Sequence, residues 1–461
     1  MKLKVRILSI VVIIVSLVIV SGFGCKQTNP KKYMLNLEIW GLFDDQDAFA
    51  EIITNYQKAN PNIARITYKK LMPDTYKQEV LDALASGTGP DIFLIQNNWL
   101  PSFANKIYPA SEQVLSGKKF RDNFVDVVAT DFLGSDGVYA VPLSVDSLGL
   151  YYNKDLFNAA GIVSPPKDWN EFVTDSRRLT KLDKNNQIEI SGAALGTTSN
   201  INRSTDILNL LMLQNQTEMV DMTKGQAAFD RVVQKNNINT MPGEESLAFY
   251  TQFANSSSAQ YSWNSNMHYS IDAFSEGTAA MMINYSWQVD TIVNKSPKLN
   301  FAIAPVPQIL GNPPINYANY WAYAVTKNKT LDTTGIPPAQ ASLATNDIRI
   351  AEAWNFLIYL TTKPEQVLTT PTDAIFDPAI NYLQKTNKVA ARRDLIEVQK
   401  NDPKIGPFAE GNLIAKNWYQ IDADAITYLF ADMINQVNRG QASVSEVIKT
   451  TAISISQMMN R

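Results

Sequence analysis

The sequence predicts an α/β fold in which helices cover the faces of open, mainly parallel sheets. The apolar run "DIFLIQ" at residues 91–96 is continuous and lies between "GTGP" and "NNW", as expected of a strand buried on both faces. The first third of the chain alternates between strand and helix patterns in the order βαβαβ. The chain has 461 residues, a length that suggests about two or three domains with large cores.

Three strands and two helices are expected in this first third. The strands fall at residues 34–40, 63–68 and 91–96, and the helices at 46–61 and 74–87. In the first helix the apolar side chains recur every three or four residues and form one face; they are Phe49, Ile52, Ile53 and Tyr56. Asp44 or Asp45 is the expected N-cap, because Asp is a preferred capping residue. Gly87 is expected to end the second helix.

The remaining chain mixes the same two patterns. A helix opens with Asp168 as N-cap and Glu171 three residues later, which is typical of a capping box. The segment "LDKNNQIEISGAAL" predicts a hairpin with Asn185 and Asn186 in its turn. Other strands are expected within 139–153, 278–284, 300–306 and 320–326, and other helices near 203–214, 245–254, 348–366 and across 418–459.

The N-terminus has the pattern of an export signal. A basic start, "MKLKVR", precedes an apolar run at residues 7–20 and then small residues, which predicts a signal peptide over residues 1–24. An uncleaved membrane helix is the alternative, because the run reaches the ~20 residues of a span if it continues to Gly24. Residues 25–32 are polar and predict a tether. Either way, the rest of the chain is expected outside the cytoplasm.

Cys25 is the only cysteine, so no disulfide can form within the chain. It lies between the signal and the tether, where neither a core cysteine nor a catalytic thiol is expected. Cleavage before Cys25 followed by lipid attachment would anchor the protein to the outer face of the cell membrane, since two acyl chains give stable anchoring. Exported lipoproteins prefer Leu three positions earlier, and this chain has Gly22 there. The uncleaved helix therefore stays open.

Composition and motifs argue against several functions. The formal net charge is −3, and Lys and Arg are spread along the chain, so no nucleic-acid surface is predicted. His268 is the only histidine and lies in the polar segment "NSNMHYS", where a solvated side chain is expected. One histidine and one cysteine cannot form a nitrogen/sulfur metal site. No Gly-x-Ser-x-Gly, phosphate loop or Cys-x-x-Cys occurs. We expect no catalysis, metal or cofactor.

Four segments carry the patterns of one family. Residues 55–93 contain its helix-to-strand step at Pro61, with Tyr56 where Phe is usual, and the step "ASGTGPD". The other segments are "VDSLGLYYNKDLFNAAGIVSPPKDWNEF", "FSEGTAAMMINYSWQ" and "AEAWNFLIYLTTKPEQ". In this order they resemble the extracellular solute-binding proteins of ABC importers, a family that includes maltose-type and other carbohydrate binders. The chain departs from the family at 317–323, "YANYWAY", where a Gly-Gly pair is frequent.

This resemblance implies a type II periplasmic-binding-protein-like fold of two lobes with the ligand cleft between them. By analogy, the first lobe takes residues 33–140 and 300–326, and the second takes 141–299 and 327–461. The implied function is a monomeric, lipid-anchored receptor that captures an extracellular carbohydrate and delivers it to an ABC permease. Closure of the two lobes about the ligand would signal occupancy.

A sugar site needs flat aromatic faces for C–H groups and polar side chains for hydroxyls. Ligands bind at the carboxyl ends of strands in open α/β sheets, and the candidates near such ends are Trp40, Asn97, Asn98, Trp99 and Trp287. Three further candidates lie in segments whose position in the fold the sequence predicts less clearly: Trp263, Trp321 and Trp418. Asp146 occupies a position where the family often contacts ligand, and a cap or turn aspartate is the alternative role. Trp169 and Trp354 have helical core spacing.

Two other classes of function remain open. A peptide or polyamine binder would share the architecture, but would need charged groups such as an Arg–Asp clamp in the cleft. An exported glycan-acting enzyme would need two carboxylates about 5–10 Å apart, which sequence spacing neither shows nor excludes.

Overall fold

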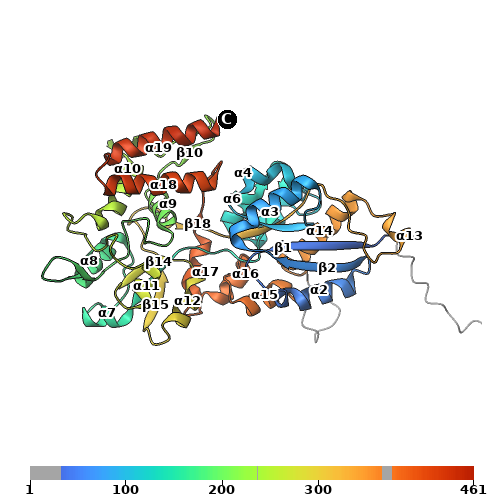
Figure 1. The fold of residues 1–461 in the computed structure, drawn as a ribbon, viewed down its shortest axis with the longest axis horizontal. Coiled ribbons are helices and arrows are strands. Elements are labelled where there is room, and N and C mark those ends of the chain that lie inside the picture. The colour runs from blue at the N-terminus through green and yellow to red at the C-terminus, as the bar shows by residue number, and fades with distance from the viewer. Residues whose placement is uncertain (1–32, 236, 366–375, 461) are drawn as a thin grey trace, which may run out of the picture.

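The computed structural model describes residues 33–235, 237–365 and 376–460, and these form two lobes side by side (Figure 1). The expected signal peptide over residues 1–24, the tether and Cys25 lie outside the described residues. Within the described ranges, no helix has both the length and the apolar character that a membrane crossing requires.

The first lobe is built on a five-stranded sheet of order β2-β1-β3-β17-β6. Its strands are β1 (Leu35–Gly41), β2 (Ile63–Lys70), β3 (Ile92–Gln96), β6 (Ala140–Val141) and β17 (Trp321–Val325). Strand β1 pairs in parallel with β2 and β3, whereas β17 runs antiparallel between β3 and β6. The late strand thus returns to the first lobe, as the resemblance implied.

Helices pack on this sheet at the positions that the sequence pattern predicted. The four predicted core residues of α2 (Asp47–Ala59) are all buried. Helix α3 (Pro73–Ser86) ends at Gly87, whose φ of +72° is the left-handed conformation that glycine adopts without strain. The shorter helices of the segment are α4 (Leu100–Phe103), η1 (Ala104–Lys106), α5 (Gly117–Asn123) and α6 (Asp126–Phe132).

The second lobe has a three-stranded sheet of order β14-β7-β15, with bounds Met281–Asn284, Gly149–Asn153 and Phe301–Pro305. Both outer strands run antiparallel to β7. The prediction of a mainly parallel sheet is therefore wrong for this lobe. Strands β14 and β15, joined by α12 (Gln288–Lys295), are parallel to each other, but β7 enters between them in the opposite direction.

The helices of the second lobe include the predicted capping box. The Asp168 carboxylate accepts hydrogen bonds from Asn170 N (2.8 Å) and Glu171 N (2.9 Å) at the start of α8 (Trp169–Leu179). The lobe also contains α7 (Lys154–Ala159), α9 (Ser204–Gln214), α10 (Pro242–Thr251), η2 (Gln252–Ala254), α11 (Ser270–Ser275), α17 (Gly406–Leu413), α18 (Ala423–Asn438) and α19 (Val444–Met459). Helices α18 and α19 pack together at the top of Figure 1.

Short strand pairs complete the fold. The predicted hairpin is present as β8 (Lys181–Leu182) and β9 (Ile188–Ile190), and Asn186 in its turn has a φ of 60°. The other pairs are β4 (Leu133–Gly134) with β5 (Gly137–Val138), β10 (Val220–Asp221) with β11 (Gln226–Ala227), β12 (Val233–Lys235) with β13 (Ile238–Thr240), and β16 (Asn316–Tyr317) with β18 (Ala415–Lys416).

Part of the C-terminal region lies in the first lobe, contrary to the predicted division. Helix α14 (Asn346–Thr361) contacts β1, β17 and α2, and α15 (Pro378–Thr386) contacts α2. The buried Trp354 of α14 donates its indole N–H to the Tyr108 carbonyl of the first lobe at 3.0 Å. The assignment of 327–461 to the second lobe is thus wrong for α14 and α15, because the apolar face of α14 covers the first sheet. The neighbouring helices are α13 (Pro338–Ala341) and α16 (Arg393–Gln399).

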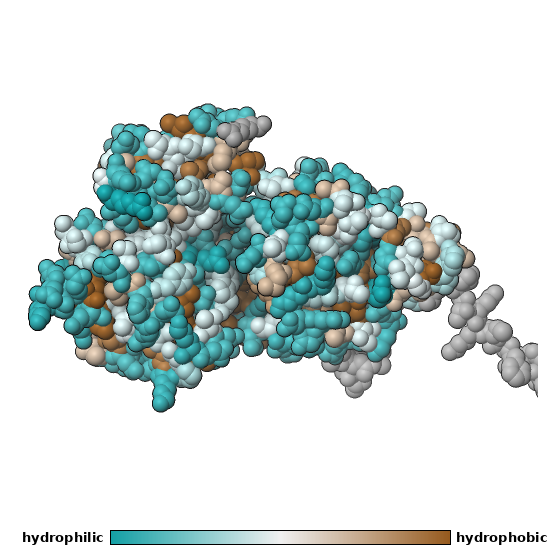
Figure 2. Space-filling view, in the orientation of Figure 1, coloured by the Kyte–Doolittle hydropathy of each residue, from teal (hydrophilic) through white to brown (hydrophobic). Residues whose placement is uncertain are grey.

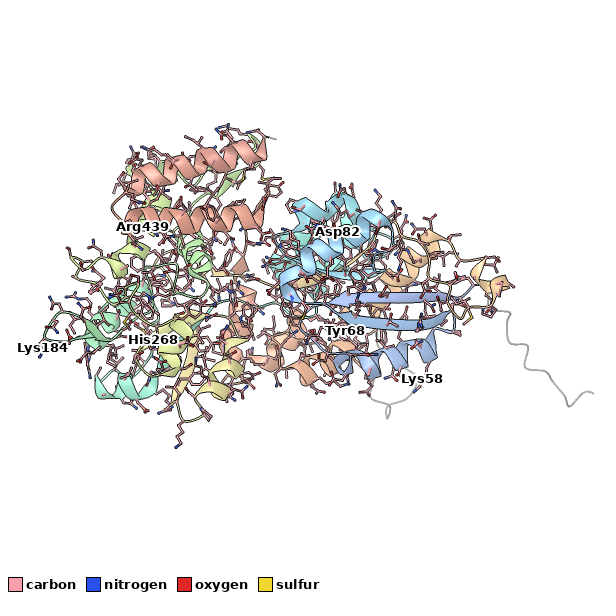
Figure 3. The ribbon with its side chains drawn as sticks, viewed as in Figure 1. Lys58, Tyr68, Asp82, Lys184, His268 and Arg439 are labelled. Carbon is pink, nitrogen blue, oxygen red and sulfur yellow. The ribbon has the colours of Figure 1, made fainter. Side chains whose placement is uncertain are left out.

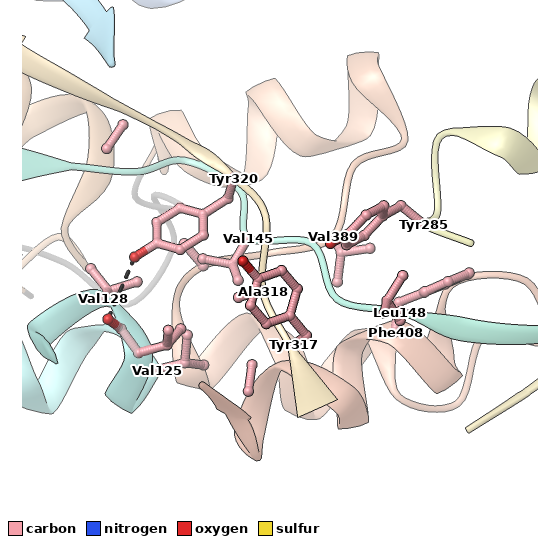
Figure 4. Close-up of a cluster of buried hydrophobic side chains, with 14 of the residues drawn as sticks. Val125, Val128, Val145, Leu148, Tyr285, Tyr317, Ala318, Tyr320, Val389 and Phe408 are labelled. Carbon is pink, nitrogen blue, oxygen red and sulfur yellow. Dashed lines mark hydrogen bonds between the residues drawn. The ribbon is translucent and has the colours of Figure 1, made fainter. Parts of the chain in front are cut away.

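Two crossing segments, residues 142–148 and 306–320, join the sheets of the lobes, and the chain crosses a third time between α15 of the first lobe and α17 of the second. The two crossing segments lie side by side where Ser147 and Ala318 form an antiparallel bridge. Figure 4 shows Val145 of one segment among Tyr317, Ala318 and Tyr320 of the other, all of them buried. The hydrophobic core therefore continues through the junction between the lobes.

Candidate functional site

A cavity of about 580 Å³ lies between the lobes and is lined by residues of both lobes and of both crossing segments. Figure 2 shows the surface hollowed where the two lobes meet. The volume falls within the ~300–1,000 Å³ of sites that bind small molecules. The junction is thus the strongest candidate for a ligand site among the described residues.

Two tryptophans line this cavity from opposite lobes. Trp321, the first residue of β17, makes edge-to-face contacts with Phe43 (ring centroids 5.6 Å) and Trp99 (4.9 Å) in the first lobe. Trp287 precedes α12 in the second lobe and stacks on the buried Tyr285 with ring centroids 4.5 Å apart. Trp287 is 41% exposed, so part of its indole surface is free to pack against a ligand.

Arg203 lies beside this second aromatic surface. Its guanidinium carbon is 5.2 Å from the ring centroid of Trp287, a cation–π distance. Arg203 precedes α9 with a φ of 62°, a conformation that is uncommon for residues other than glycine and that concentrates at functional sites. The sequence pattern did not single out Arg203, since backbone strain leaves no signal in composition or periodicity.

A second polar group lines the cavity on the first-lobe side. The buried Asp44 carboxylate accepts hydrogen bonds from Lys388 Nζ (2.6 and 2.8 Å) and from Tyr382 Oη (2.7 Å). The prediction of Asp44 or Asp45 as the N-cap of α2 is wrong, because Gln46 holds that position and makes no side-chain cap. The sequence could not reveal this group, since more than 300 residues separate Asp44 from its partners.

Asp146 lies in the crossing segment 142–148 and lines the cavity, as its predicted role requires. Its Oδ2 accepts hydrogen bonds from Ser286 N (3.0 Å) and Ser286 Oγ (2.5 Å), and its Oδ1 accepts one from Ser147 N (2.9 Å). Burial raises the pKa of this carboxyl to about 7, although the hydrogen bonds from Ser286 and Ser147 oppose the shift.

Five of the eight predicted site residues do not line the cavity. Trp40 is buried beneath Lys69, whose Nζ lies 4.6 Å from the ring, and Trp99 stacks on Phe103 behind Trp321. Trp263 has no exposed surface and donates its indole N–H to Asn200. Alternate side chains of a strand point to opposite faces, so proximity to a strand end does not ensure exposure.

The two predicted asparagines bind other side chains. Asn97 Nδ2 donates to the Asp131 carboxylate at 3.2 Å, and Asn98 Nδ2 donates to Gln420 Oε1 at 3.4 Å. Trp418 is buried and donates to Asn209, while Trp169 and Trp354 belong to the core as predicted.

The structure also locates the groups considered for other chemistry. His268 is solvated, as predicted, and pairs with Glu276 at 2.8 Å in the second lobe (Figure 3); it is not among the residues that line the cavity. Across the described parts of the chain, His, Cys, Asp and Glu form no group of three or more that could hold a metal ion.

Two α/β lobes with a cavity at their junction define a two-lobe binding protein. The family described as bacterial extracellular solute-binding protein matches residues 40–367, which is more than half of the chain. The chain therefore belongs to the bacterial extracellular solute-binding proteins.

Relatives and solved structures of this family are distant. A binding protein of Brucella abortus is 22% identical over 266 residues, which cover 56% of this chain and 59% of that relative, so the chain spans about three-fifths of its length. The multiple sugar-binding protein of Streptococcus mutans is 23% identical over 344 residues, 73% of each protein. The cyclic alpha-maltosyl-1,6-maltose binding protein of Arthrobacter globiformis is 18% identical with a TM-score of 0.69, covering 92% of this chain and 99% of that one. This likeness shows the two-lobe fold.

Proposed function

We propose that this protein binds a carbohydrate outside the cytoplasmic membrane and delivers it to an ABC permease. The observation that carries the proposal is the pair of tryptophans, Trp287 and Trp321, which line one cavity from opposite lobes. Sugar rings present C–H faces that pack against indole, and closing the lobes on a ring would bring both indoles to it. The sugar-binding activity named for the relatives from Streptococcus mutans and Arthrobacter globiformis supports this choice.

Polar groups that line the cavity can form hydrogen bonds with the sugar hydroxyls. Asp44 and Lys388 form a hydrogen-bonded pair on the first-lobe side of the cavity, which also holds Trp321, and Asn319 of the crossing segment 306–320 lines the cavity as well. A carboxylate accepts and an ammonium donates, so the pair can bind two neighbouring hydroxyl groups. A ligand that contacts both lobes stabilises the closed form through its differential affinity for that form.

A peptide-like ligand is the second candidate, because opposite charges also line this cavity. Arg203 and Asp290 are both exposed and belong to the second lobe. A ligand with a free carboxylate and a free amine could pair with them. The two candidates differ in where the ligand contacts fall, since the sugar proposal relies on Trp287 and Trp321.

The N-terminal attachment completes the proposal. Cleavage before Cys25 and addition of lipid would hold the monomeric receptor at the outer face of the membrane, with residues 25–32 as the tether. Mass spectrometry of the mature N-terminus tests this part: a diacylated Cys25 supports it, and an intact residue 1 shows an uncleaved helix instead.

A thermal-shift screen tests the proposed ligand class. The chain is melted with mono- and oligosaccharides, peptides and polyamines, because a ligand that binds only the folded state raises the melting temperature by mass action. A sugar that raises the melting temperature, in a manner lost in Trp287→Ala, supports the proposal. Stabilisation by a peptide and by no sugar would establish the second candidate instead.

A further inference from the structure

The aromatic pair Tyr285–Trp287 belongs to the turn before α12, and no side chain of this turn caps that helix. Strand β14 ends at Asn284 and α12 begins at Gln288, so three residues carry both rings. Trp287 holds the N-cap position of α12 and makes no side-chain cap. The first N–H groups of α12 find acceptors inside the turn, since Gln288 N donates to the Tyr285 carbonyl at 3.2 Å and Val289 N to the Ser286 carbonyl at 3.0 Å. The N–H groups of the turn itself, which precede the helix, need an acceptor from elsewhere.

Asp146 supplies that acceptor from the crossing segment. Its Oδ2 binds both the N–H and the hydroxyl of Ser286, which uses the two lone pairs of that oxygen. The backbone N–H groups of Ser286 and Trp287 both stabilise the charged form of this carboxyl. Oδ2 therefore has no lone pair left for a ligand hydroxyl, whereas Oδ1 accepts from Ser147 N.

A second carboxylate, the half-buried Asp206, holds the other ring of the pair. Tyr285 Oη donates to Asp206 Oδ2 at 2.9 Å, and Asn319 Nδ2 donates to the same oxygen at 3.4 Å. Asn319 also donates its backbone N–H to the Asp146 carbonyl at 3.0 Å. One crossing segment thus binds the turn directly through Asp146, and the other is linked to it through Asp206 and Asp146.

We propose that Asp146 is a positioning residue: it fixes the Ser286–Trp287 turn so that the Trp287 indole faces the cavity, and it acts on the ligand through Trp287. The relevance to binding rests on the proposed function, whereas the positioning itself does not. Because Asp146 lies in a segment that joins the lobes, the same contact connects the turn that carries Trp287 to this segment.

The first test needs no ligand. In the full chain, kept in mild detergent, Asp146→Asn replaces one acceptor oxygen by an amide N–H₂, so either Ser286 or Ser147 loses its partner in each amide orientation. Acrylamide quenching of the Trp287 emission, taken as the difference from the matching Trp287→Phe protein, is expected to increase. Ser286→Ala, which removes only one donor, should change it in the same direction and less.

Asp131→Asn is the matched control, because it makes the same buried change at a carboxyl that binds Tyr320 and Asn97 instead. The Asp131→Asn protein should show wild-type quenching of Trp287 even if its melting temperature is lower than that of the wild type. Wild-type quenching in Asp146→Asn, or equal changes in the two variants, would overturn the positioning role.

The second test separates positioning from direct contact. With maltotriose as the probe, calorimetry should show about a tenfold loss of affinity in Asp146→Asn, the scale of leaving a buried donor unpaired. In the Trp287→Phe background the same substitution should cause no further loss. Additive losses would mean that Asp146 contacts the sugar directly. If the wild type does not bind maltotriose, the proposed function fails for this sugar, while the quenching result still decides the positioning role.

Discussion

Each lobe contributes one tryptophan wall to the cavity, Trp321 from the first lobe and Trp287 from the second. The two indoles are held in place by different kinds of contact. Trp321 belongs to a sheet strand and packs against Trp99, Phe43 and Tyr76. Trp287 belongs to a three-residue turn that hydrogen bonds to the buried carboxyl of Asp146 hold in place. The first wall is fixed by apolar packing and the second by polar anchoring. The walls should therefore differ in their response to pH and to the loss of the ring.

The largest expected effect is the pH dependence that Asp146 contributes at the polar-anchored wall. Burial raises the folded-state pKa of Asp146 from 3.8 to about 7, so the folded state binds its proton more tightly than the unfolded state. This group adds stability that is fully present below about pH 4 and is lost as pH rises through about 7. A shift of about three pKa units corresponds to the order of 4 kcal/mol.

Urea unfolding of wild type and Asp146→Asn at pH 5 and pH 8 measures this difference. The free energy of unfolding of the wild type minus that of the variant should fall between the two values of pH. Burial also raises the pKa of Asp131 to about 7 and raises that of Asp206, but both groups are present in both proteins, so their contributions cancel in the difference. An equal difference at both values of pH would show that Asp146 does not titrate in this range.

Loss of the packed ring should mainly reduce stability. Trp321→Ala removes an indole that contacts three other aromatic rings, so the free energy of unfolding should fall by about 2–3 kcal/mol, less than for a fully buried tryptophan. Urea unfolding at pH 8 checks this value. A change below about 0.5 kcal/mol, typical of a surface substitution, would contradict packing as the support of this wall.

Loss of the anchored ring should mainly reduce binding. Trp287→Ala should weaken sugar affinity by about 1–3 kcal/mol, the scale of one aromatic contact. Its stability should change less than that of Trp321→Ala, because Trp287 is 41% exposed. Calorimetry and urea unfolding of both variants give the comparison, and unchanged affinity would remove Trp287 from the site.

The smallest effect is expected at an ion pair that joins the lobes directly. Lys77 of α3 and Asp424 of α18 are 2.6 Å apart, with side chains that are 32% and 70% exposed. An exposed pair contributes about 0–1 kcal/mol and is screened by salt. Lys77→Ala should thus change ligand affinity by less than about 1 kcal/mol at 0.15 M salt. A larger loss would make this contact part of the closing mechanism.

The sequence predicted the fold well wherever the determining signals are local. Continuous apolarity identified β3, three- and four-residue spacing identified the buried face of α2, and the Asp168–Glu171 pattern identified the start of α8. The direction of β7 between β14 and β15 was not predictable in this way, since both pairing directions suit a short buried strand. The lobe to which α14 belongs was missed because its apolar face does not reveal which sheet it covers.

The site was harder to predict than the fold. Trp287, Trp321 and Asp146 were predicted and line the cavity, whereas Trp40 and Trp263 have similar sequence surroundings and are buried. Exposure depends on which face of the sheet a side chain takes and on what packs over it. The Asp44–Lys388 pair depends on the meeting of distant segments, which no local pattern records.

We propose that a sugar binds between the two tryptophan walls. The most direct test is a calorimetric titration of wild type, Trp287→Ala and Trp321→Ala with the sugar that stabilises the wild type most. Both variants should lose affinity, one through the anchored wall and the other through the packed wall. Wild-type affinity in both variants would contradict the account and place the ligand elsewhere on the protein.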